Sequence, residues 1–259
     1  MQERPIGAPK LRPLTTHDIG CALKMALRDF RAAIVPGLLF ASFFVIVGLL
    51  AAWVTALAGQ TFWLVLAVMG FPLIGAFAAF GFYETSRRIE AGESVTLGAL
   101  GRTVWQARGG QLPWLAVIIV IIFLFWFFLG HMIFALFLGL KTMMNISSSL
   151  DVFVTPAGLQ MLSFGTVVGA IFAALIFAMT VIALPMLLDR EVDFVTAMLA
   201  SIGAVKRQPV MFFSWGASIA AITLIASIPM FLGLFIVLPI LGHATWHIYR
   251  AICVSEEGA

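Results

Sequence analysis

Long apolar runs alternate with short polar stretches along this chain, as they do in proteins that cross a bilayer several times. About 20 apolar residues suffice to cross the hydrocarbon core as a helix. Runs of about this length or more occupy residues 32–57, 61–83, 113–140, 159–188, 210–228 and 230–249. We therefore predict an all-α, polytopic membrane helical bundle with six transmembrane helices. Residues 15–252 would form its single domain, between an N-terminal tail at 1–14 and a C-terminal tail at 253–259.

A short amphipathic helix is predicted before each pair of spans. Thr15 followed by Asp18 resembles a capping box that opens the first of these helices. Its apolar stripe comprises Ile19, Leu23, Ala26, Leu27 and Phe30. The third helix begins with Asp193 as its N-cap and stops before Pro209. Its apolar side comprises Val195, Met198, Ile202 and Val205. Helices of this kind either lie in the membrane interface or pack under the bundle, and the pattern leaves both open.

The three polar segments also resemble one another. Shifting the first along the chain matches residues 22, 23, 27 and 31 with 99, 100, 104 and 108, and then with 197, 198, 202 and 206. Equal spacing suggests a threefold repeat of an amphipathic helix plus a transmembrane hairpin. Apolar helices also imitate one another by chance, so the repeat is a hypothesis.

Composition and charge agree with a membrane protein and give it an orientation. The chain is 62% hydrophobic and 10% charged, with a mean hydropathy of +1.10. Every Lys and Arg except Lys141 lies outside the outer loops, and basic loops are retained in the cytoplasm. We expect the bacterial inner membrane, with both termini cytoplasmic. The predicted cytoplasmic basic face comprises Lys24, Arg28, Arg31, Arg108, Lys206 and Arg207.

This arrangement of basic residues along apolar runs argues against nucleic-acid binding, so membrane lipids are the expected contacts. Cys21 and Cys253 fall in predicted cytoplasmic segments, where thiols stay reduced, and match no metal motif. We expect them to be free.

Histidine is the first candidate for chemistry. His243 and His247 are four residues apart, a spacing that can hold a metal or present an imidazole to haem. A third ligand is hard to find, because His131 lies far along another span and His17 stands alone. The alternative is that the pair belongs to an interfacial belt of aromatic and basic residues. We therefore predict no metal site and no cofactor, with His243 and His247 as weak candidates for cofactor binding.

Other features point to packing and to a possible solute path. Gly165, Gly169 and Ala173 form a ladder of small residues at every fourth position, where two helices can approach closely. The predicted second, fourth and sixth spans contain Pro72, Pro185 and Pro239, which can kink helices and expose carbonyl groups. No Asp, Glu, Lys or Arg lies well inside a span, which argues against ion coupling. Motifs for nucleotide binding, redox or hydrolytic chemistry are absent, so we expect no enzyme and no catalytic residue.

Three segments carry a family resemblance: residues 14–19 with 22–23 and 29–30, residues 184–190 with 193–194, and residues 242–247 with 249–250. Together they resemble a prokaryotic family of predicted integral membrane proteins of unknown function. Some members of that family are labelled putative cytochrome c oxidase subunits. The resemblance implies an association with cytochrome c oxidase. Because the chain lacks the set of His ligands of a catalytic oxidase subunit, we expect an accessory or assembly subunit of a larger membrane complex, a respiratory one. The alternative is a transporter or lipid-handling protein for an uncharged or lipid-like solute.

Overall fold

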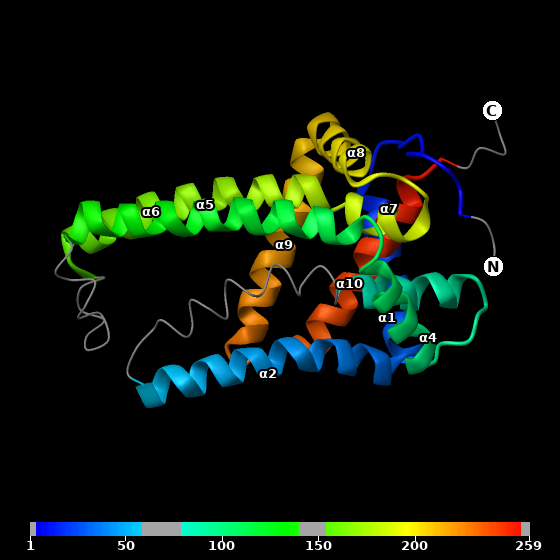
Figure 1. Cartoon of the computed structure of the whole chain (residues 1–259), viewed down its shortest axis with the longest axis horizontal. Helices are drawn as coiled ribbons and strands as arrows, with labels where there is room; N and C mark the ends of the chain where they lie inside the picture. The colour runs from blue at the N-terminus through cyan, green and yellow to red at the C-terminus, as the bar shows by residue number, and fades with distance from the viewer. Residues whose placement is uncertain (1–3, 59–78, 140–153, 255–259) are drawn as a thin grey trace.

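The computed structural model describes residues 4–58, 79–139 and 154–254, and these residues fold as a helical bundle. Residues 79–90 are also helical and carry no label in Figure 1. The labelled helices are α1 (Thr16–Ala32), α2 (Ile34–Ala58), α4 (Leu97–Ala107), α5 (Leu112–Leu138), α6 (Pro156–Thr180), α7 (Ala183–Asp189), α8 (Phe194–Arg207), α9 (Pro209–Ser227) and α10 (Leu234–Ile252).

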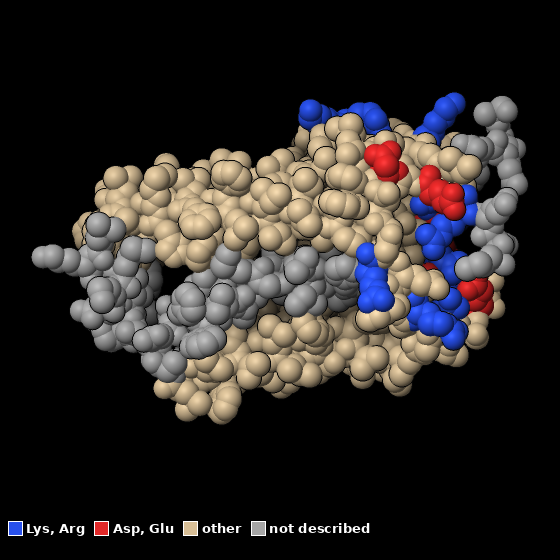
Figure 2. Space-filling model, viewed as in Figure 1, with Lys and Arg blue, Asp and Glu red and all other residues tan. Residues whose placement is uncertain are grey.

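The helices divide the molecule into an apolar part and a charged end. Figure 1 shows α5 and α6 running together along the long axis, α2 along the opposite side, and the short helices gathered at one end. On the face drawn in Figure 2, the Lys, Arg, Asp and Glu side chains of the described residues gather toward that same end. We call it the charged end; it contains α1, residues 79–90, α4, α7, α8 and the last turns of α10. This separation is the one that a bilayer imposes.

Four helical segments within the described ranges are long and apolar enough to cross a membrane: Ile34–Val54, Leu112–Leu138, Pro156–Asp189 and Pro209–Ser227. They match the first, third, fourth and fifth predicted spans. The predicted span at 61–83 lies mostly outside the described residues. The predicted span at 230–249 corresponds to α10, which is not among the four because His243, His247 and Arg250 lower its hydropathy. Six spans, like the threefold repeat, therefore stay a prediction.

The predicted amphipathic helices form as α1, α4 and α8. The capping box at Thr15 is confirmed, because the Thr15 hydroxyl accepts the Asp18 N–H at 3.2 Å and the Asp18 carboxylate accepts the Thr15 N–H at 2.9 Å. Asp193 caps α8 by accepting the Thr196 N–H at 2.9 Å, and α8 ends before Pro209, as predicted. These caps satisfy N–H groups that the first helical turn leaves unpaired.

The buried faces of α1 and α8 differ from the predicted ones. In α1 the buried residues are Ala22, Ala26 and Asp29, whereas Leu23 and Leu27 are exposed. In α8 the buried residues are Ala197, Ser201, Ala204 and Val205; the predicted Val195 is exposed. Small side chains let these helices sit close to their neighbours, so large apolar side chains turn outward. The predicted stripes were therefore right at Ala26 and Val205, and wrong at Leu23, Leu27 and Val195.

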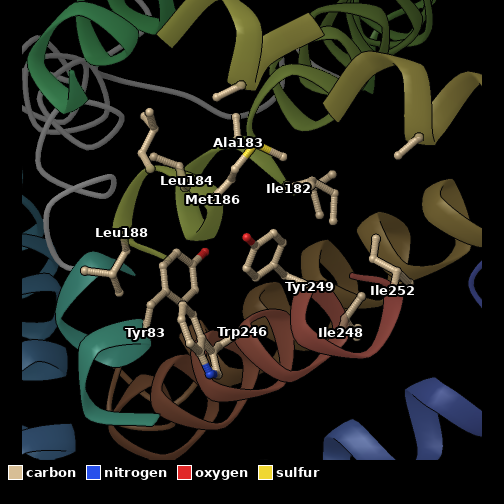
Figure 3. Close-up of a cluster of buried hydrophobic side chains, with 14 of the residues drawn as sticks. Tyr83, Ile182, Ala183, Leu184, Met186, Leu188, Trp246, Ile248, Tyr249 and Ile252 are labelled. Carbon is tan, nitrogen blue, oxygen red and sulfur yellow. The ribbon is translucent and has the colours of Figure 1, made fainter. Parts of the chain in front are cut away.

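A cluster of buried side chains from α7 and α10 lies at the charged end. Six consecutive residues of α7, from Ala183 to Leu188, are buried, as are Trp246, Ile248, Tyr249 and Ile252 of α10. Figure 3 shows these two groups facing each other, with Tyr83 beside them. Close approach of residues 79–90 to α10 requires Gly242, where an added Cβ would lie 2.7 Å from the Phe82 Cβ. Contacts with α1, α7 and residues 79–90 together fix the orientation of α10.

Candidate functional site

Both histidines of α10 point into the charged end. His243 and His247 have no exposed surface, and neither do the neighbouring Trp246 and Tyr249. A belt in contact with lipid headgroups, the interpretation favoured by their composition, would leave such residues exposed. The interfacial interpretation was wrong because α1, α7 and residues 79–90 cover this turn of α10.

His247 lies between two carboxylates. Its Nε2 is 2.6 Å from Asp29 Oδ2, and its Nδ1 is 3.4 Å from Glu90 Oε1. Asp29, on α1, has no exposed surface. Glu90 also accepts the Trp246 indole N–H at 3.1 Å and lies 3.3 Å from the Arg250 guanidinium. One imidazole therefore joins α10 to two other helices.

The surroundings favour the ionised form of both carboxylates. Burial raises the pKa of Asp29, but hydrogen bonds with His247 and Ser86 outweigh burial and hold that pKa below its usual range. Burial likewise raises the pKa of Glu90, and the adjacent His247 imidazole together with the charge of Arg250 brings it below the usual range. Charges inside the cluster are therefore balanced by partners from the same chain.

His243 extends the network one turn further along α10. Its Nδ1 lies 2.9 Å from the Ser86 hydroxyl and 3.1 Å from the Phe82 carbonyl. Ser86 also contributes to lowering the pKa of Asp29, so both histidines adjoin the same buried group of polar side chains. The Nε2 of His243 is buried with no hydrogen-bond partner, so the polar chain ends at this atom. We call Asp29, Ser86, Glu90, His243 and His247 the polar core.

A second ionic cluster lies on the same helix as Ser86. The Glu84 carboxylate is 1% exposed and lies 2.7 Å from Arg87 Nε and 2.6 Å from Arg88 Nε. Thr103 of α4 donates its hydroxyl hydrogen to Glu84 at 3.1 Å. Burial raises the pKa of Glu84, whereas the two guanidinium groups lower it and prevail. This cluster attaches α4 to residues 79–90.

A third polar link connects α10 with α7. The Tyr249 hydroxyl donates to Asp189 Oδ2 at 2.7 Å, and Arg250 approaches the same carboxylate at 3.7 Å. The three links together tie every short helix except α8 to α10 or to residues 79–90. Their common chemistry is a carboxylate held by donors from another helix, which fits internal bracing.

A cavity of about 430 Å³ opens beside these links. Its lining combines apolar side chains such as Phe80 and Leu187 with two basic and two acidic residues: Arg4, Arg190, Glu191 and Asp193. The Arg190 side chain is 10% exposed, and its Nε has no hydrogen-bond partner. Its closest carboxylate oxygen, on Asp189, lies 4.0 Å away. This cavity offers a buried guanidinium to an anionic group.

The remaining predicted residues fall into three groups. All six residues of the predicted basic face are exposed at the charged end. In the small-residue ladder, an added Cβ at Gly169 would lie 3.2 Å from the Trp126 indole nitrogen, whereas Gly165 meets nothing within 4 Å and Ala173 is exposed. His131 faces its own helix, with Nδ1 2.9 Å from the Phe127 carbonyl.

Metal binding finds no support in the part of the chain that is described. Among those residues no group of three or more His, Cys, Asp or Glu side chains is placed to hold a metal ion. Cys21 and Cys253 are free thiols. His17 lies beside Cys21, with the sulfur 3.7 Å from Nε2.

Sequence reasoning missed Asp29, Ser86 and Glu90. One signal was available for Asp29, which follows Ala22 and Ala26 at helical spacing and therefore shares their buried face. Ser86 and Glu90 carried no comparable signal, because their helix extends past the predicted end of the second span at residue 83.

The folded chain is thus a multi-pass integral membrane protein with a polar core at its charged end. Residues 64–189, just under half of the chain, match the model of a family described as predicted integral membrane protein (DUF2189). The chain is similar to that family over this segment, which runs to the end of α7. No curated protein and no solved structure matches the chain.

Proposed function

We propose that this protein is a non-catalytic accessory or assembly subunit that packs laterally against another membrane protein. Its setting would be the bacterial inner membrane, with both termini in the cytoplasm. A respiratory complex is the proposed partner on the ground of the family resemblance alone. The basic residues exposed at the charged end support the orientation, because such residues are retained in the cytoplasm.

The observation that carries the proposal is the exposed face of α9. Only 17% of the apolar stretch of α9 is buried against the rest of the chain. Ser214, Ala217, Ser218 and Ala221 are all exposed and share one side of the helix. Small residues line helix contacts in membranes because they let two backbones approach closely, whereas lipid contact needs no such selection.

The polar core supports a non-catalytic role. Its two carboxylates face donors of the same chain, and four of its five residues, all but Glu90, are buried. A catalytic group has to reach its substrate. Buried, mutually paired charges instead hold helices in register, so the charged end can serve as a rigid support for the exposed α9 face.

Site-specific photocrosslinking in native membranes tests the proposal. A crosslinking amino acid at Ala217 or Ser218 is expected to capture one discrete protein partner. The matched control is the same amino acid at Val167 of α6, which is 60% exposed and lies among other large apolar residues. Capture at neither α9 position, or equal capture at Val167, would contradict the proposal.

A second candidate function, lipid handling, is favoured by the cavity beside Arg190. An apolar wall next to an under-paired guanidinium suits an amphiphile with an anionic headgroup. Mass spectrometry of protein purified in mild detergent is expected to detect a retained phospholipid, and Arg190→Gln is expected to reduce its occupancy. Arg102→Gln, at an exposed arginine outside the cavity lining, is the control. Equal lipid retention in both variants would remove this candidate.

A further inference from the structure

The connection between α9 and α10, residues 228–233, consists of five apolar residues followed by Gly233. Ile228, Pro229, Met230, Phe231 and Leu232 contain no polar side chain, and the first, third and fifth of them are 79%, 62% and 55% exposed. Pro229 and Gly233 are common turn residues, but the connection lacks the Asn, Asp or Ser that commonly gives a turn in water a polar side chain. The composition of this turn therefore matches contact with hydrocarbon.

Four N–H groups of the turn are satisfied internally. The N–H groups of Ile228, Met230, Phe231 and Leu232 each donate to a carbonyl within the same turn or the end of α9, at 2.8–3.2 Å. Pro229 has no N–H. An unpaired N–H in lipid costs several kcal/mol, so only a turn of this kind tolerates that environment.

Its position along α2 is the third observation. The Phe231 ring packs on Gly48, where an added Cβ would lie 2.9 Å from the ring. Phe44 and Val45 complete this contact with Leu234. Gly48 lies about 21 Å along α2 from Ile34, at 1.5 Å per residue, and α2 continues for about 15 Å beyond it. The turn thus stops well short of the far end of α2.

Figure 1 shows the same relation for the whole hairpin. α9 crosses from α8 toward α2 instead of running parallel to α5 and α6, and its far end lies beside the middle of α2. The paired ends of α5 and α6 project much further from the charged end. α9 is long enough to cross a bilayer, but it is inclined to the direction that α5 and α6 follow.

We propose that α9 and α10 form a re-entrant hairpin, which enters the membrane from the charged end and turns within the hydrocarbon. Its tip is an interaction surface for the acyl chains of the leaflet next to the charged end. The hairpin returns to the side from which it came, so α9 and α10 do not cross the bilayer. It also displaces lipid in one leaflet only, which a pair of complete spans does not do.

Side-specific cysteine labelling tests this topology in intact membranes and inverted vesicles. Cys21→Ser and Cys253→Ala give a background without cysteine. Met230→Cys is expected to react with a membrane-impermeant maleimide on the order of tenfold more slowly than either control, from either side, because the reagent does not enter hydrocarbon. Lys24→Cys marks the charged end, and Val154→Cys, 71% exposed beside the start of α6, marks the opposite end.

If α9 and α10 both crossed the bilayer, their turn would instead be exposed to water on the same side of the membrane as Val154→Cys. Labelling of Met230→Cys at the rate and from the side of Val154→Cys would therefore overturn the proposal. Ile228→Cys provides a second position should Met230→Cys fold poorly, and the same outcomes apply. Met230→Asp adds a second readout: a charge in hydrocarbon is expected to reduce the folded yield, whereas an unchanged yield would contradict a tip in lipid.

Discussion

Replacing Asp29 with Asn removes the negative charge opposite His247 while keeping the shape of the side chain. Asp29 and His247 have no exposed surface and lie 2.6 Å apart. Removing one partner of a buried pair costs about 3–5 kcal/mol, because the other partner remains buried without its counter-charge. Glu90 also faces His247 and is partly exposed, so we expect the lower part of this range.

Thermal unfolding in a mild detergent measures this cost. A loss of 3 kcal/mol lowers Tm by about 6–12 °C in a protein of this size. Glu93→Gln is the control, because its carboxylate is 39% exposed and exposed ion pairs contribute about 0–1 kcal/mol. A double-mutant cycle that combines Asp29→Asn with His247→Gln is expected to show a coupling energy of more than about 0.5 kcal/mol between positions 29 and 247. Equal Tm values for Asp29→Asn and Glu93→Gln would refute the view that the polar core braces the charged end.

Two further predictions concern packing and pH. Gly242→Ala is expected to destabilise the fold by about 1–3 kcal/mol, since its Cβ would press on Phe82, whereas Gly165→Ala, with nothing within 4 Å, is expected to be neutral or stabilising in unfolding experiments. The lowered pKa values of Asp29 and Glu84 contribute stability that is present above about pH 4, the usual pKa of such groups, and is lost as the pH falls below it. Unfolding midpoints measured from pH 7 to pH 3 are expected to drop only in the acidic part of this range; a flat profile would count against ionised carboxylates.

The apolar runs of the sequence predict most of the described long helices, because crossing a bilayer requires about 20 consecutive apolar residues. The apolar runs at 32–57 and 113–140 agree with α2 and α5 to within two residues. Capping chemistry locates the starts of α1 and α8 equally well, since Thr15 and Asp193 act on neighbours in sequence. Local rules therefore succeed where the interacting residues are close along the chain.

The same reasoning fails where burial depends on distant segments. Asp29 and His247 are far apart in sequence, and only the packing of α1 against α10 brings them together. Periodicity likewise identifies residues 210–228 as long enough to cross, but the direction of α9 depends on the contact of its connection with Gly48. A sequence pattern gives the length of a helix and not its tilt.

Extraction of the protein from native membranes with a lipid-retaining polymer, followed by mass measurement and proteomics, tests the central claim most directly. If the exposed α9 face is a protein contact, the particle is expected to contain a second membrane protein in fixed ratio, and Ala217→Phe is expected to remove it while leaving Tm unchanged. A particle that contains only the 28.1 kDa chain and lipid would contradict the account.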